Sequence, residues 1–239
     1  MQSPVRLFYP SQCISCGELV DSEGALCGSC WRDTHFITGT ICDCCGVPLL
    51  GDSAPDEILQ CDGCRDHPHV WDRGRAAFVY RDTGRKLVLG LKHGDRQELA
   101  APASKWMARA AEDIVDDDTI VAPIPLHWSR FLKRRYNQSA LLSRGIATQL
   151  GLEHCPDLLK RVRRTVSLEG LGPKERTATV SGAIAVNPKR QHLIEGRPIL
   201  LVDDVLTTGA TFDAAARACF ASQACEVNVI TLARVAQDT

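Results

Sequence analysis

From about residue 71 to the C-terminus, the chain alternates short apolar runs with stretches whose apolar residues recur at helical spacing. Residues 119–125 and 198–202 are almost entirely apolar, which is typical of parallel strands buried on both faces. Residues 137–150 are amphipathic, and Leu87 and Leu91 lie one helical turn apart in a helix predicted over residues 83–92. This alternation predicts an α/β fold with a parallel sheet that helices cover on both faces.

The same pattern places the remaining elements. We predict further strands at residues 75–80, 157–161, 183–187 and 227–233, and further helices at residues 98–114, 127–135 and 211–222. Residues 163–179 carry many charges without periodicity, so they are predicted to form a mobile loop that ends in a short helix.

Composition is that of an ordinary globular protein, with 239 residues, 44% of them apolar and 24% charged. No run of about 18 apolar residues is present. Residues 1–10 lack the charged-then-apolar pattern of a secretion signal. We therefore expect a cytoplasmic protein that does not insert into a membrane.

Residues 10–70 differ from the rest, because they are rich in Cys, Gly, Asp and Pro and have few periodic apolar runs. Such a segment cannot bury much apolar surface, so something else must hold it together. Residues 1–70 hold 3 Lys and Arg against 10 Asp and Glu, whereas residues 71–239 hold 25 against 19. The contrast predicts two domains, 1–70 and 71–239. It suggests that the basic body meets an anionic partner, although solvated charged faces are the plainer alternative.

Nine of the twelve cysteines lie between Cys13 and Cys64, arranged as four C-x-x-C units. In a cytoplasmic chain such a cluster indicates metal ligands before disulfides. Each unit places two thiolates on one turn, and two units complete a tetrahedral four-sulfur site. Gly17 and Gly46 follow two of the units, where a tight turn favours a residue without Cβ. We predict two structural zinc ions, one bound by Cys13, Cys16, Cys27 and Cys30 and the other by Cys42, Cys45, Cys61 and Cys64.

Cys44 is left over by this assignment. A cross-braced pairing of the units, a single occupied site and an iron–sulfur cluster stay open as alternatives. A disulfide framework is the least favoured of them.

The segment from residue 199 to residue 211 combines an apolar strand, two acids, a loop of small residues and a helix start. Ligands of open parallel sheets bind at the carboxyl ends of strands, where this loop should lie. Backbone N–H groups of such a loop, together with the helix N-terminus, form an anion site. The carboxylates of Asp203 and Asp204 only accept hydrogen bonds, so they suit vicinal sugar hydroxyls. The segment therefore predicts a sugar-phosphate site. An acidic turn with a threonine helix cap is the plainer alternative.

These residues resemble the phosphoribosyl-diphosphate signature of type I phosphoribosyltransferases. With the cysteine-rich head, Pro-Ile-Pro-Leu-His at residues 123–127 and Arg-Tyr-Asn-Gln at residues 135–138, nearly the whole chain resembles the ComF family. That family joins a double zinc ribbon to a phosphoribosyltransferase domain and is associated with DNA uptake in bacterial natural transformation. The resemblance implies a parallel-sheet, type I phosphoribosyltransferase-like α/β domain preceded by a small zinc-ribbon module.

The resemblance also implies roles for individual residues. Asp203 and Asp204 would hold the ribose 2′- and 3′-hydroxyls, and Mg²⁺ would bridge the diphosphate to water and sugar oxygens. The 5′-phosphate would be held by Thr207, Thr208, Gly209, Ala210 and Thr211. The diphosphate would be near Lys92, Arg134, Asn137 and Gln138. A helix C-terminal cation is the alternative for Lys92, and a helix N-cap is the alternative for Asn137.

Two motifs depart from the family pattern. The loop that usually reads Arg-x-x-x-Thr-x-x-Gln has Arg161 and Thr165 in place, but Leu168 stands where the glutamine is expected. The later Arg-x-x-Asn becomes Arg176-x-x-Thr179. The residues expected to hold the sugar phosphate are intact while the predicted lid is altered, so sequence favours binding over turnover.

Three functions follow. As an enzyme, the protein would displace diphosphate at ribose C1 through an oxocarbenium-like state, with Asp203, Asp204 and Lys92 as its catalytic groups. As a non-enzymatic competence factor, it would bind single-stranded DNA and dock a helicase or transport protein through the zinc head. Trp128 and Tyr136 would then offer stacking faces. The DNA phosphates would be contacted by Arg130, Lys133, Arg135, Lys160, Arg161, Arg163 and Arg164. A third possibility is a regulator that senses nucleotide supply.

Overall fold

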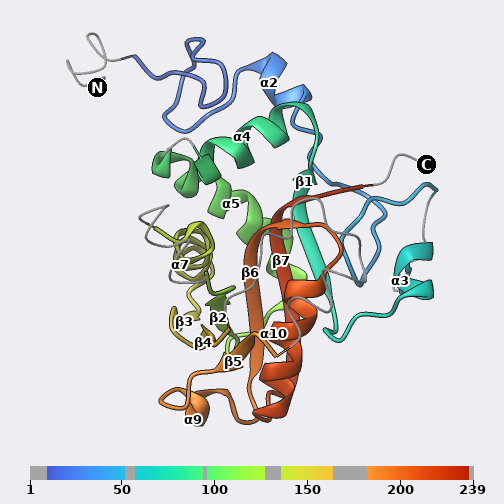
Figure 1. Cartoon of the computed structure of the whole chain (residues 1–239). Coiled ribbons are helices and arrows are strands. Elements are labelled where there is room, and N and C mark those ends of the chain that lie inside the picture. Colours follow the sequence, from blue (N-terminus) through green and yellow to red (C-terminus); the bar gives the residue numbers. More distant parts are fainter. Residues whose placement is uncertain (1–9, 52–56, 94–95, 127–135, 164–181, 237–239) are drawn as a thin grey trace.

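The computed structural model describes residues 10–51, 57–93, 96–126, 136–163 and 182–236 (Figure 1). The helices of the described part are α2 (Gly28–Arg32), α3 (Asp62–Asp66), α4 (Asp82–His93), η1 (Gln97–Leu99), α5 (Ala100–Ala111), η2 (Glu112–Ile114), α7 (Gln138–Leu150), α9 (Gln191–Ile194) and α10 (Ala210–Ala221). The strands are β1 (Gly74–Val79), β2 (Ile120–Pro123), β3 (Glu153–His154), β4 (Leu159–Arg161), β5 (Ile184–Val186), β6 (Pro198–Leu206) and β7 (Glu226–Arg234).

The main sheet has five strands in the order β1-β7-β6-β2-β3, and every neighbouring pair is parallel. The predicted parallel α/β fold is therefore confirmed. Strand β6 is central: Leu200 is in register with Val121 of β2 on one side and with Asn228 of β7 on the other. Strand β3 was not predicted, because its two residues are too short to show a pattern.

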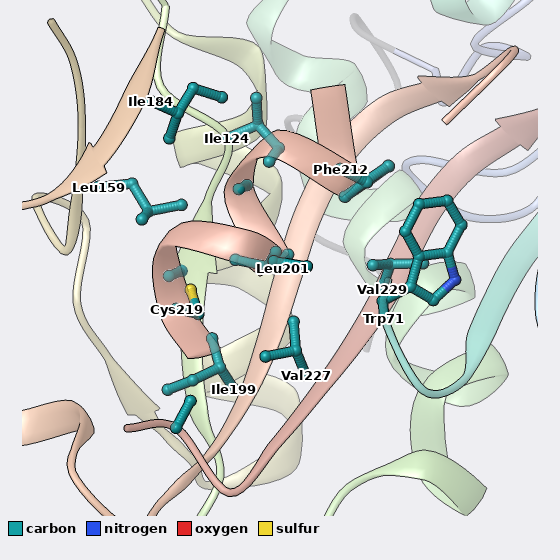
Figure 2. Packing of buried hydrophobic residues seen from close by; sticks show 14 of the residues in the cluster. Trp71, Ile124, Leu159, Ile184, Ile199, Leu201, Phe212, Cys219, Val227 and Val229 are labelled. Carbon is teal, nitrogen blue, oxygen red and sulfur yellow. The ribbon is translucent and has the colours of Figure 1, made fainter. Parts of the chain in front are cut away.

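The two faces of this sheet are covered by different kinds of structure. Successive residues of β6 point to opposite faces. Leu200 and Val202 enter a core formed with α4, α5 and α7. Ile199 and Leu201 enter a second core formed with α10, the β4–β5 pair and part of the cysteine-rich head (Figure 2). Figure 1 shows α7 and α10 on opposite sides of β6.

Strand β6 is longer than its apolar run. We predicted a strand over residues 198–202 with the two acids at its end, but β6 continues through both acids to Leu206. The reason lies in β7, which stays paired with this segment: Asp203 is in register with Thr231 and Val205 with Ala233. Backbone pairing thus extends the strand past the point where its side chains become polar.

The strands predicted at residues 157–161 and 183–187 exist in shorter form but lie outside the main sheet. They are β4 and β5, which pair with each other antiparallel, with Lys160 in register with Ala185. The long helix predicted over residues 98–114 is divided into η1, α5 and η2. The helix predicted at residues 127–135, and the loop predicted at residues 163–179 except for Arg163, lie outside the described residues.

The cysteine-rich head folds as two similar units. In each, a backbone bridge flanks the first C-x-x-C, pairing Gln12 with Leu19 in one unit and Ile41 with Pro48 in the other. Gly17 and Gly46 have φ values of 83° and 68°, which confirms the tight turn predicted after these cysteines. The second C-x-x-C of each unit opens a short helix, α2 or α3. Among the described residues, no helix is both long and apolar enough to cross a membrane.

Candidate functional site

Three charged side chains meet near the carboxyl end of β6. The Lys92 ammonium, from the last turn of α4, lies 3.0 Å from Asp204 Oδ1. Asp204 is buried, and Lys92 is half-buried beside it. Burial disfavours the charged ammonium, but the Asp204 and Asp203 carboxylates outweigh that effect and raise the pKa of Lys92. The structure thus brings together the three residues that the sequence predicted as catalytic.

Asp203 is the carboxyl of this group whose pKa is raised. Burial and the adjacent negative charge of Asp204 raise the pKa of Asp203 from 3.8 to about 6. Two hydrogen bonds to its Oδ1 oppose this shift: the Ser139 hydroxyl donates at 2.7 Å and the Asp204 backbone N–H at 2.9 Å. The site holds two carboxylates whose negative charge one lysine only partly balances, so a further cation would stabilise it.

The predicted phosphate loop follows directly. Gly209 is the N-cap of α10 and has φ 77°, in the left-handed region that favours glycine. Ala210 and Thr211 lie in the first helical turn, so the helix begins one residue earlier than predicted. Backbone N–H groups of a first turn have no partner within the helix. A hollow over the loop is lined by Asp203 and residues 205–212, which include Thr207 and Thr208. This shape suits an anion beside the two acids.

A wall of two aromatic rings closes one side of the loop. His69 and Trp71 stack with their ring centres 3.9 Å apart. A Cβ added to Gly209 would lie 2.5 Å from the Trp71 ring and 2.6 Å from the His69 ring. Asp213 of α10 fixes this wall, because its carboxylate lies 3.1 Å from His69 Nδ1 and accepts the Val70 N–H at 2.8 Å. The loop is therefore held against the segment that leaves the cysteine-rich head.

Residues 136–138, which come after the Pro-Ile-Pro-Leu-His segment, support the site through hydrogen bonds. Asn137 caps α7 by accepting the Ser139 N–H at 3.1 Å, and its amide donates to the Ile124 carbonyl oxygen at 3.2 Å. The buried Gln138 donates to the Lys92 carbonyl oxygen at 3.3 Å. Tyr136 donates its hydroxyl proton to the Leu91 carbonyl oxygen at 2.7 Å. These contacts position the end of α4, while the N-cap alternative for Asn137 is confirmed.

The other predicted binding residues fall into two groups, one outside the described residues and one near β4. Arg134, Arg130, Lys133, Arg135 and Arg164 lie outside the described residues, and so does Trp128. The rest of the predicted DNA-contacting set lies on or just after β4. Lys160 and Arg163 are exposed there, and Arg161 is half-buried.

Both predicted metal clusters are assembled. The Sγ atoms of Cys13, Cys16, Cys27 and Cys30 (the first cluster) lie within 4.8 Å of one another, as do those of Cys42, Cys45, Cys61 and Cys64 (the second cluster). Tetrahedral zinc with Zn–S bonds of about 2.3 Å requires sulfur atoms about 3.8 Å apart. The Cys16–Cys27 and Cys45–Cys61 pairs lie at 3.6 Å and 3.8 Å. All twelve cysteines lie in the described residues and are free thiols. Two four-sulfur sites thus fit two structural zinc ions.

Sequence reasoning missed four residues of this region. Ser139 was hidden inside a predicted helix, although it directly follows the Arg-Tyr-Asn-Gln motif. His69 and Trp71 had one signal, their place at the boundary between the cysteine-rich and α/β parts. Arg234 donates to the Leu206 and Thr207 carbonyl oxygens at 3.2 Å and 3.0 Å. No local pattern marks it, because its partners are 27 and 28 residues away along the chain.

Comparisons with known proteins match both parts of the chain. The double zinc ribbon domain family matches residues 5–67, and the phosphoribosyl transferase domain family matches residues 137–239. The DNA utilization protein YhgH of Salmonella typhimurium is 29% identical over 235 residues, which cover 95% of this chain and 99% of that protein. Competence protein ComFC of Bacillus subtilis is 28% identical over 228 residues, covering 90% of this chain and 87% of the relative.

Two further matches are another relative and a solved structure. Competence protein F of Haemophilus influenzae is 25% identical over 212 residues, covering 86% of this chain and 89% of the relative. A solved structure of glutamine phosphoribosylpyrophosphate amidotransferase from B. subtilis matches 60% of this chain and 30% of that protein, with 16% identity and a TM-score of 0.39.

The fold and the cysteine clusters define a protein that joins a double zinc ribbon to a phosphoribosyltransferase domain. The relatives named competence protein F and ComFC are similar in sequence to this chain over most of their own length. The chain is thus similar to the ComF proteins over most of its length, which is the resemblance that its motifs predicted.

The raised pKa of Asp203 predicts a pH dependence of stability. The folded protein keeps the Asp203 proton up to about pH 6, whereas an ordinary aspartate has a pKa of 3.8. The contribution of Asp203 to the free energy of unfolding is therefore fully present below about pH 4 and is lost as the pH rises through 6. The Asp203→Asn variant keeps the Oδ1 acceptor without the charge. Between pH 4 and 7, its free energy of unfolding should rise relative to the native chain by roughly 1–3 kcal/mol.

Urea denaturation at several pH values measures this difference. Asp157→Asn is the matched control, because the Arg190 hydrogen bond lowers the pKa of Asp157 and the change should not stabilise the protein at pH 7. Equal pH profiles for the native chain and Asp203→Asn would contradict the prediction.

The cluster geometry predicts two zinc ions per chain. Releasing zinc with a mercurial reagent and counting it with a chromogenic chelator should give two equivalents for the native protein. Cys44→Ser should keep both, whereas Cys16→Ser and Cys64→Ser should each lose one. The Cys64 variant should also lose more stability, because Cys64 is buried in the core beneath the sheet and Cys16 is exposed. Iron with a visible absorption band, or zinc loss in Cys44→Ser, would refute this assignment.

Proposed function

We propose that this protein binds phosphoribosyl diphosphate with Mg²⁺ at the carboxyl end of β6, and that it serves DNA uptake in natural transformation. One observation carries the first part. Lys92, Asp203, Asp204 and Ser139 converge directly before a glycine-capped loop that opens a helix. The second part rests on the relatives, two of which are named competence proteins and one a DNA utilization protein.

The site offers a donor or acceptor for each part of such a ligand. Asp203 and Asp204 would accept hydrogen bonds from the two ribose hydroxyls. The N–H groups around Gly209 and the hydroxyls of Thr207, Thr208 and Thr211 would hold the 5′-phosphate. Lys92, already drawn toward the acids, would lie on the side of the diphosphate. Arg134 stays a candidate for the same anion.

Magnesium would be held by oxygen atoms of the ligand and water, near the carboxylates of Asp203 and Asp204. When bound, it neutralises charge on the diphosphate and so assists its departure. The protein groups would do the rest electrostatically. The two carboxylates would stabilise positive charge that develops at ribose C1, and Lys92 would stabilise the leaving diphosphate. We propose phosphoribosyl transfer as the reaction, with a nitrogen nucleophile as the acceptor. This reaction must be distinguished from phosphoribosyl binding without turnover, as in a sensor of nucleotide supply.

Titration calorimetry with phosphoribosyl diphosphate, with and without Mg²⁺, tests the binding site. We expect Mg²⁺-dependent binding to the native chain and a roughly 10- to 100-fold weaker affinity for Asp204→Asn, since a hydrogen bond to a charged group contributes about 1.5–3 kcal/mol. Arg197→Gln is the control, because Arg197 binds Asp118 and Glu153 at the opposite end of β6. No heat with the native chain would overturn the proposal. Diphosphate release across a panel of nucleobases and amines then separates transfer from sensing.

A second candidate function is direct contact with single-stranded DNA. The exposed Lys160 and Arg163 support it, because they lie in β4 and just after it, on either side of the exposed Val162. Cations of this kind would follow the phosphates of a bound strand, and partner docking would fall to the zinc ribbons.

Affinity for single-stranded DNA measured over a range of salt concentrations tests this candidate. The doubly substituted Lys160→Gln, Arg163→Gln chain should bind more weakly, and its slope of log affinity against log salt should fall by about 1.4, since each phosphate contact adds about 0.7. A matched double substitution of Lys105 and Arg109, exposed on α5, should change neither quantity. Salt-independent binding, or equal slopes for both variants, would exclude the contact.

A further inference from the structure

The two zinc ribbons attach to the α/β sheet in different ways. Cys42, Cys44, Cys45 and Cys64 are part of the hydrophobic core that also contains Leu201, Phe212 and Val229. The cysteines of the first cluster instead pack with Val20 and Leu26. The first ribbon meets the opposite, α4–α5 side of the sheet through Ile14 and Phe36. Only the second ribbon therefore shares a core with α10 and the phosphate loop.

Arg234, near the end of β7, contacts both the second cluster and the phosphate loop. Its Nη2 lies 3.7 Å from the Cys45 sulfur. Its Nη1 donates to the carbonyl oxygens of Leu206 and Thr207 at 3.2 Å and 3.0 Å, and to that of Val235 at 2.6 Å. A zinc ion bound by four thiolates leaves a net negative cluster, which attracts the guanidinium. Because the guanidinium is a rigid planar fork, its position at Cys45 also determines where the loop carbonyls lie.

The ring wall provides a second link between the same two places. Trp71 donates its Nε1 proton to the Cys44 carbonyl oxygen at 2.7 Å, so the ring is tied to the chain between two zinc ligands. The same ring contacts Phe212 edge-on, with centroids 5.8 Å apart (Figure 2). Gly209 lies so close to Trp71 and His69 that a Cβ atom would not fit there. Arg234 thus holds the beginning of the loop and the ring wall holds its end.

An ion network around the buried Arg75 anchors the second ribbon on the sheet. Asp43, between two cysteines, lies 2.7 Å from Arg75 and 3.0 Å from Arg73. Arg75 is buried and also lies 2.6 Å from Asp113 of η2. A ribbon anchored in this way can transmit the geometry of its cluster to the loop.

We propose that the second zinc ribbon is a positioning element of the phosphate loop, acting through Arg234 and the His69–Trp71 ring pair, and that the first ribbon has no such role. Arg234 is a positioning residue, because it contacts the loop backbone and not the expected ligand. The inference deepens the proposed function and rests on it for the identity of the ligand. The coupling between ribbon and loop can be measured without any ligand.

Hydrogen–deuterium exchange of the full-length, zinc-loaded protein tests the coupling, read on a peptide that spans residues 203–213. Arg234→Gln should speed amide exchange in this peptide about 10-fold or more while both zinc ions stay bound. Arg197→Gln should not, since it makes the same substitution at the start of β6. Cys64→Ser should have the larger effect on this peptide, and Cys30→Ser, which removes a buried ligand of the first cluster, should leave its exchange unchanged.

Conservative replacement separates positioning from general destabilisation. Arg234→Lys keeps the charge but lacks the fork, so its exchange should lie between those of the native chain and Arg234→Gln. If Arg234→Gln or Cys64→Ser fails to fold, the comparison of Arg234→Lys with Arg197→Lys decides. Native-like exchange of the loop peptide in the folded Arg234 variants would overturn the inference, as would faster exchange in Cys30→Ser.

Titration with phosphoribosyl diphosphate and Mg²⁺ on the same samples distinguishes this inference from the proposed function. Altered exchange together with weaker binding in Arg234→Gln supports both. Altered exchange in a protein whose native form does not bind would uphold the coupling and reject the proposed ligand. Tight binding by the native chain with unaltered exchange in every Arg234 variant would uphold the ligand and reject the coupling.

Discussion

The position of the second four-cysteine cluster inside one of the two hydrophobic cores is the constraint on which the rest of the structure depends. Cys42 and Cys45 are completely buried, and they pack with residues of β6, β7 and α10. A parallel sheet must be covered on both faces. In the described part of the chain, α4, α5 and α7 pack on one face, while α10 and α9 share the other with the β4–β5 pair and this ribbon. The cysteine side chains of this ribbon thus take the place of apolar side chains that a further helix would supply.

This arrangement has a consequence for the site. The loop after β6 is bounded by the strand pairing with β7 on one side and by the rings that follow the second cluster on the other. The acids of β6 lie where the sheet's two cores end, and Asp204 is buried there while Asp203 is half-buried. Burial and mutual repulsion raise the pKa of Asp203, and Lys92 and Ser139 only partly offset them. Such unfavourable charge is an expected feature of a functional site.

Much of this could be predicted from local pattern. The apolar run at residues 198–202 and the period of residues 137–150 indicated elements that exist, because burial of a strand or a helix face leaves a periodic trace. The C-x-x-C spacing indicated two metal sites, because two thiolates on one turn need no distant partner to be recognised. The extent of β6, the separate β4–β5 pair and the short β3 could not be predicted, since each depends on pairing with a segment far along the chain.

By itself, the sequence determined the local chemistry of this protein: that paired cysteines could share metal ions, which loop follows the acids, and that helices alternate with parallel strands. These properties depend on residues close together in the chain, and the physical signals for them are local. Only the tertiary structure decided that Lys92 meets Asp204, that Ser139 meets Asp203, and that Arg234 lies between Cys45 and the phosphate loop. These contacts join residues tens to nearly two hundred positions apart, so they arise from how the sheet and the second ribbon pack together.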